Sequence, residues 1–512
     1  MKKIHLSMIN LWCNKNLVDS QLFLWKLLSE NPDNIEYYSD PYEKAVELII
    51  LNTCSFISSG REEMFQTVEK LLSKKKKVCI IGCGVQYFEK LLKNGMSFWM
   101  EWNGMKNLMW NTQDSSLRSE WQWDVKQPLS PSDSSPHREQ KCYSKFTSLW
   151  GEGDHEVVER LLKTELERRE KMLQNENISY LSRNDLNLAN LQNLTKRSQT
   201  FDDFCRYSAP RLLTNYENRY EYLKIAEWCN NSCAFCIIPQ IRWKLTSLPI
   251  KSVLAEAENL LKQWIEELII VAQDTMRYGT DFSSKSQLLP LLHELDKLPY
   301  DFEYRILYLY PDILTLKQLE EFASLKKFIP YFDIPLQHIS PKLLKSMGRF
   351  YDDKMIHTLL KWIRSLFPNS FIRTNIIIWF PGETDEDMQL LQSFLDEDYF
   401  DNIALFEYHD EPLAKSSAFE NKVPDSVVHS RFKTIRTQVD KFIKAREKKR
   451  KWKNQIGFVE WISEKKGEIY LSIRPEINCP EIDPVDEVKL ENIIKCFDGE
   501  EIEIGSRVEY VC

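Results

Sequence analysis

The sequence of 512 residues predicts an α/β protein with three folded parts. These are an N-terminal open parallel α/β sheet, a central (βα)6 partial barrel and a small C-terminal β-barrel. Strand-like apolar segments alternate with helical periodicity over 1–110 and again over 209–450, which indicates parallel sheets. Over 451–512 apolar and polar residues alternate in short runs, which favours a small antiparallel barrel of five strands.

The N-terminal part places cysteines at equivalent positions. Strand-like segments 4–11, 47–52 and 78–81 end just before Cys13, Cys54 and Cys83, and segments 17–28 and 62–72 are helical in pattern. Open α/β sheets bind ligands at the carboxyl ends of their strands. Core cysteines are expected within strands, as Cys79 is. We therefore predict that Cys13, Cys54 and Cys83 hold one iron–sulfur cluster with an open iron.

A second group of cysteines follows the apolar segment 222–226. Cys229, Cys233 and Cys236 have C-x3-C-x2-C spacing. Zinc sites usually combine two separated pairs of ligands, whereas three thiolates in one tight loop suit an iron–sulfur cluster with one iron left open. The alternative is a structural metal knuckle or three buried thiols.

The central part repeats the βα unit six times. We expect strands at 222–226, 267–273, 303–310, 330–336, 372–379 and 403–408, with chemistry in the loops at their carboxyl ends. A long, increasingly basic helix over 424–453 connects to the C-terminal part. Residues 111–208 interrupt the pattern as a hydrophilic insertion, which is partly disordered because 115–141 is rich in Ser, Pro, Asp and Gln.

Composition excludes several classes of protein. The net charge of −8 argues against nucleic-acid binding through bulk charge, and no run of 18 apolar residues predicts a membrane span. Twelve cysteines without a secretory signal indicate the reducing cytoplasm.

Several short motifs carry a family resemblance: NLVDSQ (16–21), LNTCSFI (51–57), CAFCIIP (233–239), VAQDT (271–275), LYLYPD (307–312), DIPLQHIS (333–340) and PEIDPV (480–485). With this domain order, the chain resembles the radical S-adenosylmethionine (SAM) methylthiotransferases, whose small C-terminal barrel is the OB-like TRAM domain. The residues of these motifs are most similar to those of the branch that modifies an aspartate of ribosomal protein S twelve. The other branch modifies isopentenyladenosine in transfer RNA and has Tyr where this chain has Phe235.

The resemblance implies two 4Fe-4S clusters, one on Cys229, Cys233 and Cys236 and the other on Cys13, Cys54 and Cys83. It implies SAM at the open iron of the first, a radical that takes hydrogen from the β-carbon of the aspartate, and a second cluster that delivers sulfur. Sulfur and electron donors are the further partners. The SAM neighbours that it suggests are Phe235, Gln273, Gly382 and Glu383, and His338 is either a ligand contact or a satisfied barrel histidine.

The charge of the tail supports the same branch. Residues 454–512 hold fourteen acidic and six basic side chains, a net charge of −8. RNA-binding barrels are expected to be basic, whereas an acidic barrel complements a basic ribosomal protein. We expect no direct nucleic-acid substrate.

The sequence departs from the family pattern at five tryptophans. Trp12, Trp228, Trp243, Trp264 and Trp379 stand where that pattern has glycine, and the chain has 15 Trp but only 14 Gly. Our hypothesis is that the source organism reads UGA as glycine. If the tryptophans are native, the chain is instead an impaired enzyme or an iron–sulfur interaction module.

Overall fold

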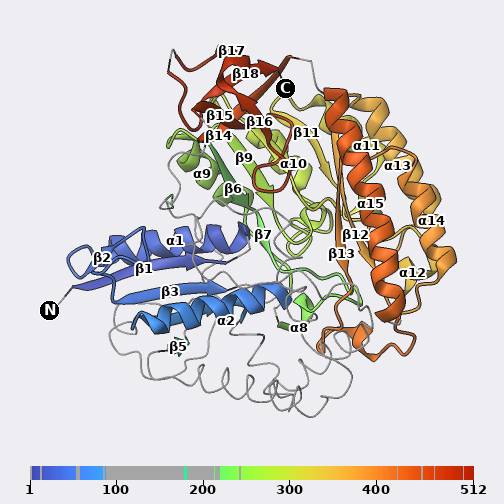
Figure 1. The fold of residues 1–512 in the computed structure, drawn as a ribbon, viewed down its shortest axis with the longest axis horizontal. Helices are drawn as coiled ribbons and strands as arrows, with labels where there is room; N and C mark the ends of the chain where they lie inside the picture. Colours follow the sequence, from blue (N-terminus) through green and yellow to red (C-terminus); the bar gives the residue numbers. More distant parts are fainter. Residues whose placement is uncertain are drawn as a thin grey trace.

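The computed structural model describes residues 3–11, 14–53, 58–84, 87, 178–180, 211, 213, 219–241, 244–423, 425–450, 454–465, 467–499 and 501–511. Cys13, Cys54, Trp12 and Trp243 lie outside these ranges, as does most of the predicted insertion. Figure 1 shows the N-terminal sheet beside one end of the central sheet, and the C-terminal strands at its other end.

The N-terminal domain is a parallel sheet of five strands in the order β2-β1-β3-β4-β5. The strands are β1 (Ile4–Asn10), β2 (Ile35–Tyr37), β3 (Leu48–Thr53), β4 (Lys77–Gly82) and β5 (Ile178–Tyr180). Helix α1 (Asn14–Glu30) packs Phe23 and Leu27 on one face, and helix α2 (Ser58–Ser73) packs Met64 and Val68 on the other. The sheet is therefore covered on both sides, as its continuous apolar strands predict.

Two elements of this sheet were not anticipated. Strand β2 lies at one edge of the sheet, next to β1. Strand β5 lies at the other edge and comes from the segment that we predicted to be a hydrophilic insertion. The three residues of β5 pair in parallel with β4, so part of 111–208 belongs to the N-terminal sheet. A strand of three residues carries too few side chains for its periodicity to be recognised.

The central sheet has six parallel strands, and its two end strands, β6 and β13, are not paired with each other. They follow the chain in order: β6 (Tyr220–Lys224), β9 (Glu267–Val271), β10 (Glu303–Ile306), β11 (Phe328–Asp333), β12 (Phe371–Ile378) and β13 (Asn402–Glu407). This confirms the predicted (βα)6 partial barrel. The predicted first strand divides in two, because Ala226–Glu227 (β7) leaves the sheet and pairs with Thr246–Ser247 (β8).

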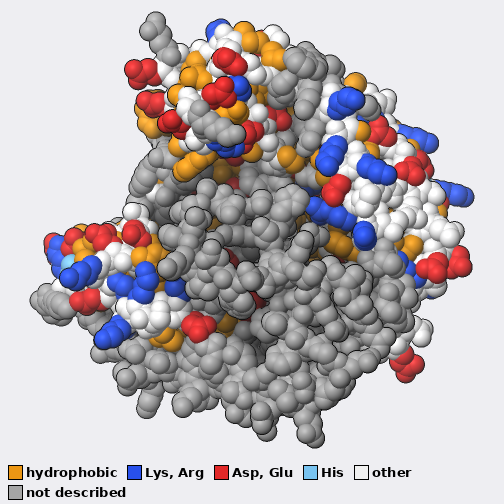
Figure 2. Space-filling view, in the orientation of Figure 1, with side chains coloured by type: hydrophobic (Ala, Val, Ile, Leu, Met, Phe, Trp, Pro, Cys, Tyr) orange, Lys and Arg blue, Asp and Glu red, His pale blue; other side chains and the backbone are white. Residues whose placement is uncertain are grey.

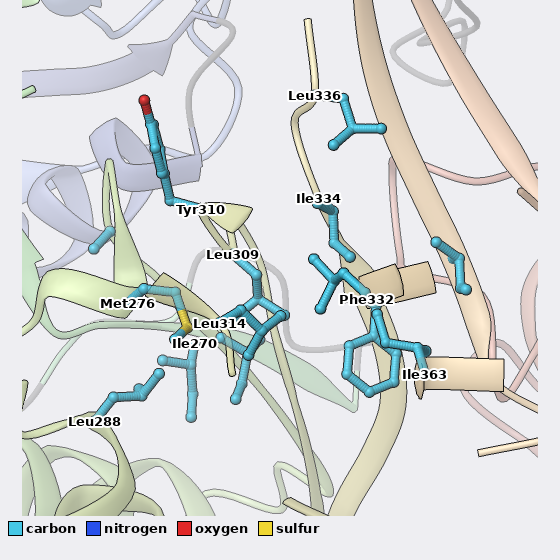
Figure 3. Packing of buried hydrophobic residues seen from close by; sticks show 14 of the residues in the cluster. Ile270, Met276, Leu288, Leu309, Tyr310, Leu314, Phe332, Ile334, Leu336 and Ile363 are labelled. Atoms are coloured by element: carbon cyan, nitrogen blue, oxygen red, sulfur yellow. The ribbon is translucent and has the colours of Figure 1, made fainter. Parts of the chain in front are cut away.

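Helices cover the outer face of the central sheet. They are α9 (Ile250–Leu261), α10 (Leu288–Asp296), α11 (Leu316–Ser324), α12 (Pro341–Ser346), α13 (Asp353–Leu366), α14 (Asp385–Leu395) and the connecting helix α15 (Asp425–Arg450). Helix α13 buries Ile356, Leu359, Leu360 and Ile363, which lie one helical turn apart on one side. Figure 3 shows how Ile363 packs toward Phe332 of β11, while Leu288 of α10 faces Ile270 of β9.

The inner face of the partial barrel has a separate apolar cluster. Tyr222, Ile269 and Tyr331 from its strands pack with Val18 of α1 and with Cys479, which lies in the connection between β15 and β16. Two other domains therefore close the open barrel, one at its side and the other at the amino ends of its strands.

The C-terminal domain has the five antiparallel strands that the sequence predicts, in the order β16-β15-β14-β18-β17. They are β14 (Asn454–Lys465), β15 (Glu468–Pro475), β16 (Asp486–Lys489), β17 (Ile493–Cys496) and β18 (Arg507–Val511). Within the described residues, no helix has the length and apolarity that a membrane crossing requires.

Candidate active site

The loop of Cys229, Cys233 and Cys236 begins directly after β7, at the carboxyl end of the central sheet (Figure 1). The backbone N–H of Ala234 donates to the Met347 carbonyl (2.9 Å), and its own carbonyl accepts from Ser416 N–H (2.9 Å). Because Met347 follows α12 and Ser416 follows β13, the loop is fixed to two other strand-end connections.

Two asparagines between the first cysteines give the loop further support. The Asn230 side-chain oxygen accepts from the Leu245 N–H (2.9 Å). The Asn231 amide donates to Asp274 (2.7 Å), and its oxygen accepts from Arg277 (3.1 Å). Asp274 and Arg277 also pair with each other at 3.1 Å, so the connection after β9 orients the cysteine loop.

Burial disfavours the thiolate form of two cysteines in this loop, Cys229 and Cys236. It raises the pKa of Cys229 to about 11 and that of Cys236 to about 12, although the backbone N–H groups of Asn231 and Ile238 oppose the respective shifts, as do Lys15 and Arg349 to a smaller extent. A bound metal centre would have to displace these protons, because the thiolate is the ligand form. Nowhere in the described chain do three His, Cys, Asp or Glu side chains gather around a single metal ion. A four-iron cluster instead distributes its thiolates over different irons.

The second cysteine triad is described only at Cys83, just after β4. This buried side chain packs with Tyr87, Ile237, Leu413 and Ala414. Ile237 is the residue after Cys236, so the N-terminal domain brings Cys83 next to the loop of the other triad. Cys13 and Cys54 are not among the described residues.

Buried polar contacts join the N-terminal domain to the central domain here. The sequence analysis did not identify the residues that form them. Lys224 of β6 bonds Asp19 of α1 as well as Glu227. Arg61 of α2 donates to Glu411 at 2.8 Å, with both side chains nearly inaccessible. Asp19 lies within the quoted NLVDSQ motif, which was the available signal.

The predicted SAM neighbours lie in loops at this end of the sheet, with different surroundings. Gln273 follows β9, and its buried Oε1 has no hydrogen-bond partner within the described chain. Gly382 adopts φ +88°, where only glycine is unstrained, and its carbonyl accepts from Lys342 (2.8 Å). The Phe235 ring lies 5.7 Å from the Arg349 guanidinium.

Glu383 points inward. Its side chain is fully buried, with one oxygen accepting from the Trp379 N–H (2.7 Å) and the other from Arg431 (3.0 Å). Burial raises the pKa of Glu383 to about 7, although the hydrogen bond from Trp379 and the charge of Arg431 both lower it. The carboxylate therefore fixes its own loop.

His338 is also fully buried. Its Nδ1 accepts from the Ser340 N–H (3.0 Å), which assigns the ring proton to Nε2, 4.0 Å from Glu383. Burial lowers the pKa of His338 to about 4, so the ring is neutral at physiological pH. His338 is therefore a buried residue of the barrel, and its Nδ1 accepts a hydrogen bond from the backbone.

Three of the five unusual tryptophans are described, and all three have left-handed backbone. Their φ values are +70° at Trp228, +68° at Trp264 and +71° at Trp379. Non-glycine residues adopt such angles in only a few per cent of cases, and bulky ones are outliers. Trp379 packs its indole near Phe432 of α15, but its buried Nε1 has no hydrogen-bond partner among the described residues, so both backbone and side chain are unfavourable at this position.

A six-stranded parallel partial barrel with a three-cysteine loop at its carboxyl end defines a radical SAM enzyme. The model of the Radical SAM superfamily matches residues 223–395, and that of Uncharacterized protein family UPF0004 matches 5–100. The radical SAM methyltransferase TsrM from Kitasatospora setae has a similar solved structure, with a TM-score of 0.46, 13% identity and coverage of 81% of this chain and 77% of that one.

Curated relatives identify the family. The chain is 32% identical over 444 residues to ribosomal protein uS12 methylthiotransferase RimO of Chlamydia pneumoniae, covering 86% of this chain and 77% of that protein. It is 29% identical to the RimO of Nitratiruptor sp. over 98% of this chain and 97% of the relative. The chain belongs to the RimO family of radical SAM methylthiotransferases.

Proposed function

We propose that this chain adds a methylthio group to the β-carbon of an aspartate in ribosomal protein uS12, the ribosomal protein S twelve of the sequence analysis. The relatives are named for this substrate protein. The observation that supports the proposal is the buried cluster that Cys83 shares with Ile237, because Cys83 belongs to the candidate sulfur-delivering triad and Ile237 follows the candidate radical-generating triad. A methylthio transfer needs both chemistries within reach of one carbon atom.

In this proposal Cys229, Cys233 and Cys236 hold one 4Fe-4S cluster, and Cys13, Cys54 and Cys83 hold the other. When bound, the clusters and SAM supply radical formation, sulfur and the methyl group. The protein's contribution is geometry: Asn231 and Ala234 fix the cysteine loop through Asp274, Met347 and Ser416.

The site of SAM follows from the same loops. Gln273 offers an acceptor oxygen that has no partner among the described residues, and Gly382 lets the backbone of its loop turn with no side chain in the way. Phe235 contributes an aromatic face beside the cysteines. Glu383 contributes indirectly, because its carboxyl group accepts from the Trp379 N–H and so fixes the turn that carries Gly382.

The substrate protein would be recognised in part by charge. Figure 2 shows acidic and hydrophobic side chains side by side over the C-terminal strands. Exposed apolar residues there include Trp461, Ile494 and Phe497. A basic protein that also offers apolar contacts fits this surface better than RNA does. Such a substrate, with reductant and sulfur donors, places the reaction in the cytoplasm.

The test compares tryptic peptides of uS12 and transfer-RNA nucleosides from cells with and without this chain by mass spectrometry. We expect the methylthio mass on one aspartate-containing uS12 peptide, lost with the chain, and no change in methylthio-adenosine. The reverse result would assign the chain to transfer RNA.

A further inference from the structure

Arg349 is buried beside the cysteine loop without a carboxylate partner. Its side chain is 6% exposed, and its Nε and Nη1 atoms have no hydrogen-bond partner among the described residues. No carboxylate of the described chain pairs with it within 4.0 Å. Burying an unpaired guanidinium costs several kcal/mol, so a native protein is expected to provide a negative charge for it.

The surroundings of Arg349 point to where that charge lies. The guanidinium lies 4.4 Å from the ring centre of Tyr310 and 5.7 Å from that of Phe235, which precedes Cys236. Asp312 is near enough for Arg349 to oppose the rise in pKa that burial causes, but its carboxylate pairs with Arg277 at 2.5 Å. The groups that raise the pKa of Arg349 include the Tyr351 hydroxyl, Cys233 and the Tyr310 hydroxyl, which also hydrogen-bonds to the guanidinium, and none of them is a carboxylate.

The backbone fixes Arg349 in this position. Met347 accepts from Ala234 of the cysteine loop, and Arg349 N–H donates to the Leu344 carbonyl (2.8 Å). Gly348 between them has φ +76°, and a Cβ there would lie 3.0 Å from the Ser232 carbonyl. The turn therefore passes close to the backbone of the cysteine loop, and Arg349 follows it directly.

We propose that Arg349 is a positioning residue whose buried positive charge compensates the cluster held by Cys229, Cys233 and Cys236 and favours its reduced state. This rests on the proposed function, because it requires that cluster. A 4Fe-4S core with three thiolates is anionic and gains one more negative charge when a one-electron donor reduces it. A fixed cation beside it makes reduction easier, since net charge and burial set the potential of such clusters.

The test is a redox titration followed by EPR, without SAM, on full-length chain carrying Cys13, Cys54 and Cys83 as Ala so that a single cluster reports. We compare Arg349→Gln and Arg349→Lys in this background. We expect Gln to shift the midpoint potential to more negative values, and Lys to stay close to the parent. Arg219→Gln is the matched control, because Arg219 pairs with Glu266 and Asp498 at the opposite end of β6.

The outcomes separate this inference from the proposed function. No iron on the parent triad would refute the function itself. A cluster whose potential is the same in Arg349→Gln, or one shifted equally by Lys and Gln, would overturn only the role of Arg349. A Gln variant that changes SAM affinity while its SAM-free potential is unchanged would also overturn it. If Gln prevents cluster assembly in a chain that circular dichroism shows to be folded, while Lys permits it, the requirement for positive charge is upheld.

Discussion

Cys83 and Ile237 belong to one buried hydrophobic cluster, although they come from different domains and lie more than 150 residues apart. Ile237 directly follows Cys236, so the end of β4 meets the cysteine loop of the partial barrel. Cys83 follows β4 of the N-terminal parallel sheet, and the cysteine loop lies at the carboxyl end of the central sheet, so the carboxyl edges of the two sheets come together here.

This contact leads to a prediction about metal content. Full reconstitution should give about eight irons per chain, as two four-iron clusters. Replacing Cys229, Cys233 and Cys236 with Ala should leave about four irons and abolish SAM cleavage. Replacing Cys13, Cys54 and Cys83 should keep SAM cleavage and stop sulfur insertion. Iron analysis and product chromatography measure both, and full iron content after either triple change would contradict the assignment.

A second prediction concerns the tryptophans with left-handed backbone. Peptide mass spectrometry of the protein from its source should find Gly at 12, 228, 243, 264 and 379, each lowering the mass by about 129 Da. Trp264 lies just beyond α9, where helices commonly end on a glycine of positive φ. Tryptophan at all five positions in an active native enzyme would refute the recoding hypothesis.

The same hypothesis makes a stability prediction for recombinant protein. Trp264 is 88% exposed, so Trp264→Gly loses little packing and relieves a strained φ of +68°. We expect stabilisation of about 1 kcal/mol. Trp461→Gly is the control, because Trp461 is also exposed but lies within strand β14, where glycine weakens a strand. Denaturant unfolding should move the two variants in opposite directions.

A fourth prediction concerns Arg305, which joins the C-terminal domain to the barrel. Its fully buried guanidinium bonds Glu267 and donates to the carbonyls of Glu476 and Ile477 at 2.8 Å each. Arg305→Met should destabilise the protein by about 3–5 kcal/mol, because it leaves buried acceptors unpaired. Arg507→Met, which removes a more exposed pair with Glu476, should cost less than about 1 kcal/mol.

Limited proteolysis adds a second measurement to that comparison. Arg305→Met should release the segment after α15 as an early fragment, since the loop 476–485 would lose its anchor in the barrel. Equal stability and equal proteolysis of the two variants would show that Arg305 does not hold the domains together.

The sequence predicted most of the fold because its strands are long and apolar. The six central segments were found within a few residues, and the cysteines marked the carboxyl ends of strands. The short strand β5 was missed, and the filling of the barrel by Cys479 and Val18 could not be inferred. Such contacts join residues hundreds of positions apart, and periodicity reports only local structure.

The surroundings of the site were less predictable than its ligands. Glu383 was expected near SAM, but it accepts from the nearby Trp379 N–H and from Arg431 of helix α15, a contact that local sequence patterns do not reveal. Arg349 gave no signal, because a lone arginine after a helix is usually solvated. Only the structure shows that it is buried beside the cysteines.

The last prediction uses the opposite pKa shifts of His338 and Glu383, which lie 4.0 Å apart. Burial lowers the pKa of His338 from 6.5 to about 4, so its contribution to stability is lost as pH falls through this range. Burial raises the pKa of Glu383 from 4.5 to about 7, so stability is lost as pH rises through that range. Between pH 4.5 and 6.5 the two groups therefore change the free energy of unfolding with pH in opposite directions.

Glu383→Gln keeps an acceptor for the Trp379 N–H but removes the titrating carboxyl. Its free energy of unfolding should rise with pH between 4.5 and 6.5 more steeply than that of the parent, by up to about 1.4 kcal/mol per pH unit. Urea unfolding at several pH values, followed by circular dichroism, measures the slope. Glu294→Gln, which changes an exposed carboxylate on α10, should leave the parent's slope intact. A Glu383→Gln slope that matches the parent would mean that Glu383 does not titrate in this window.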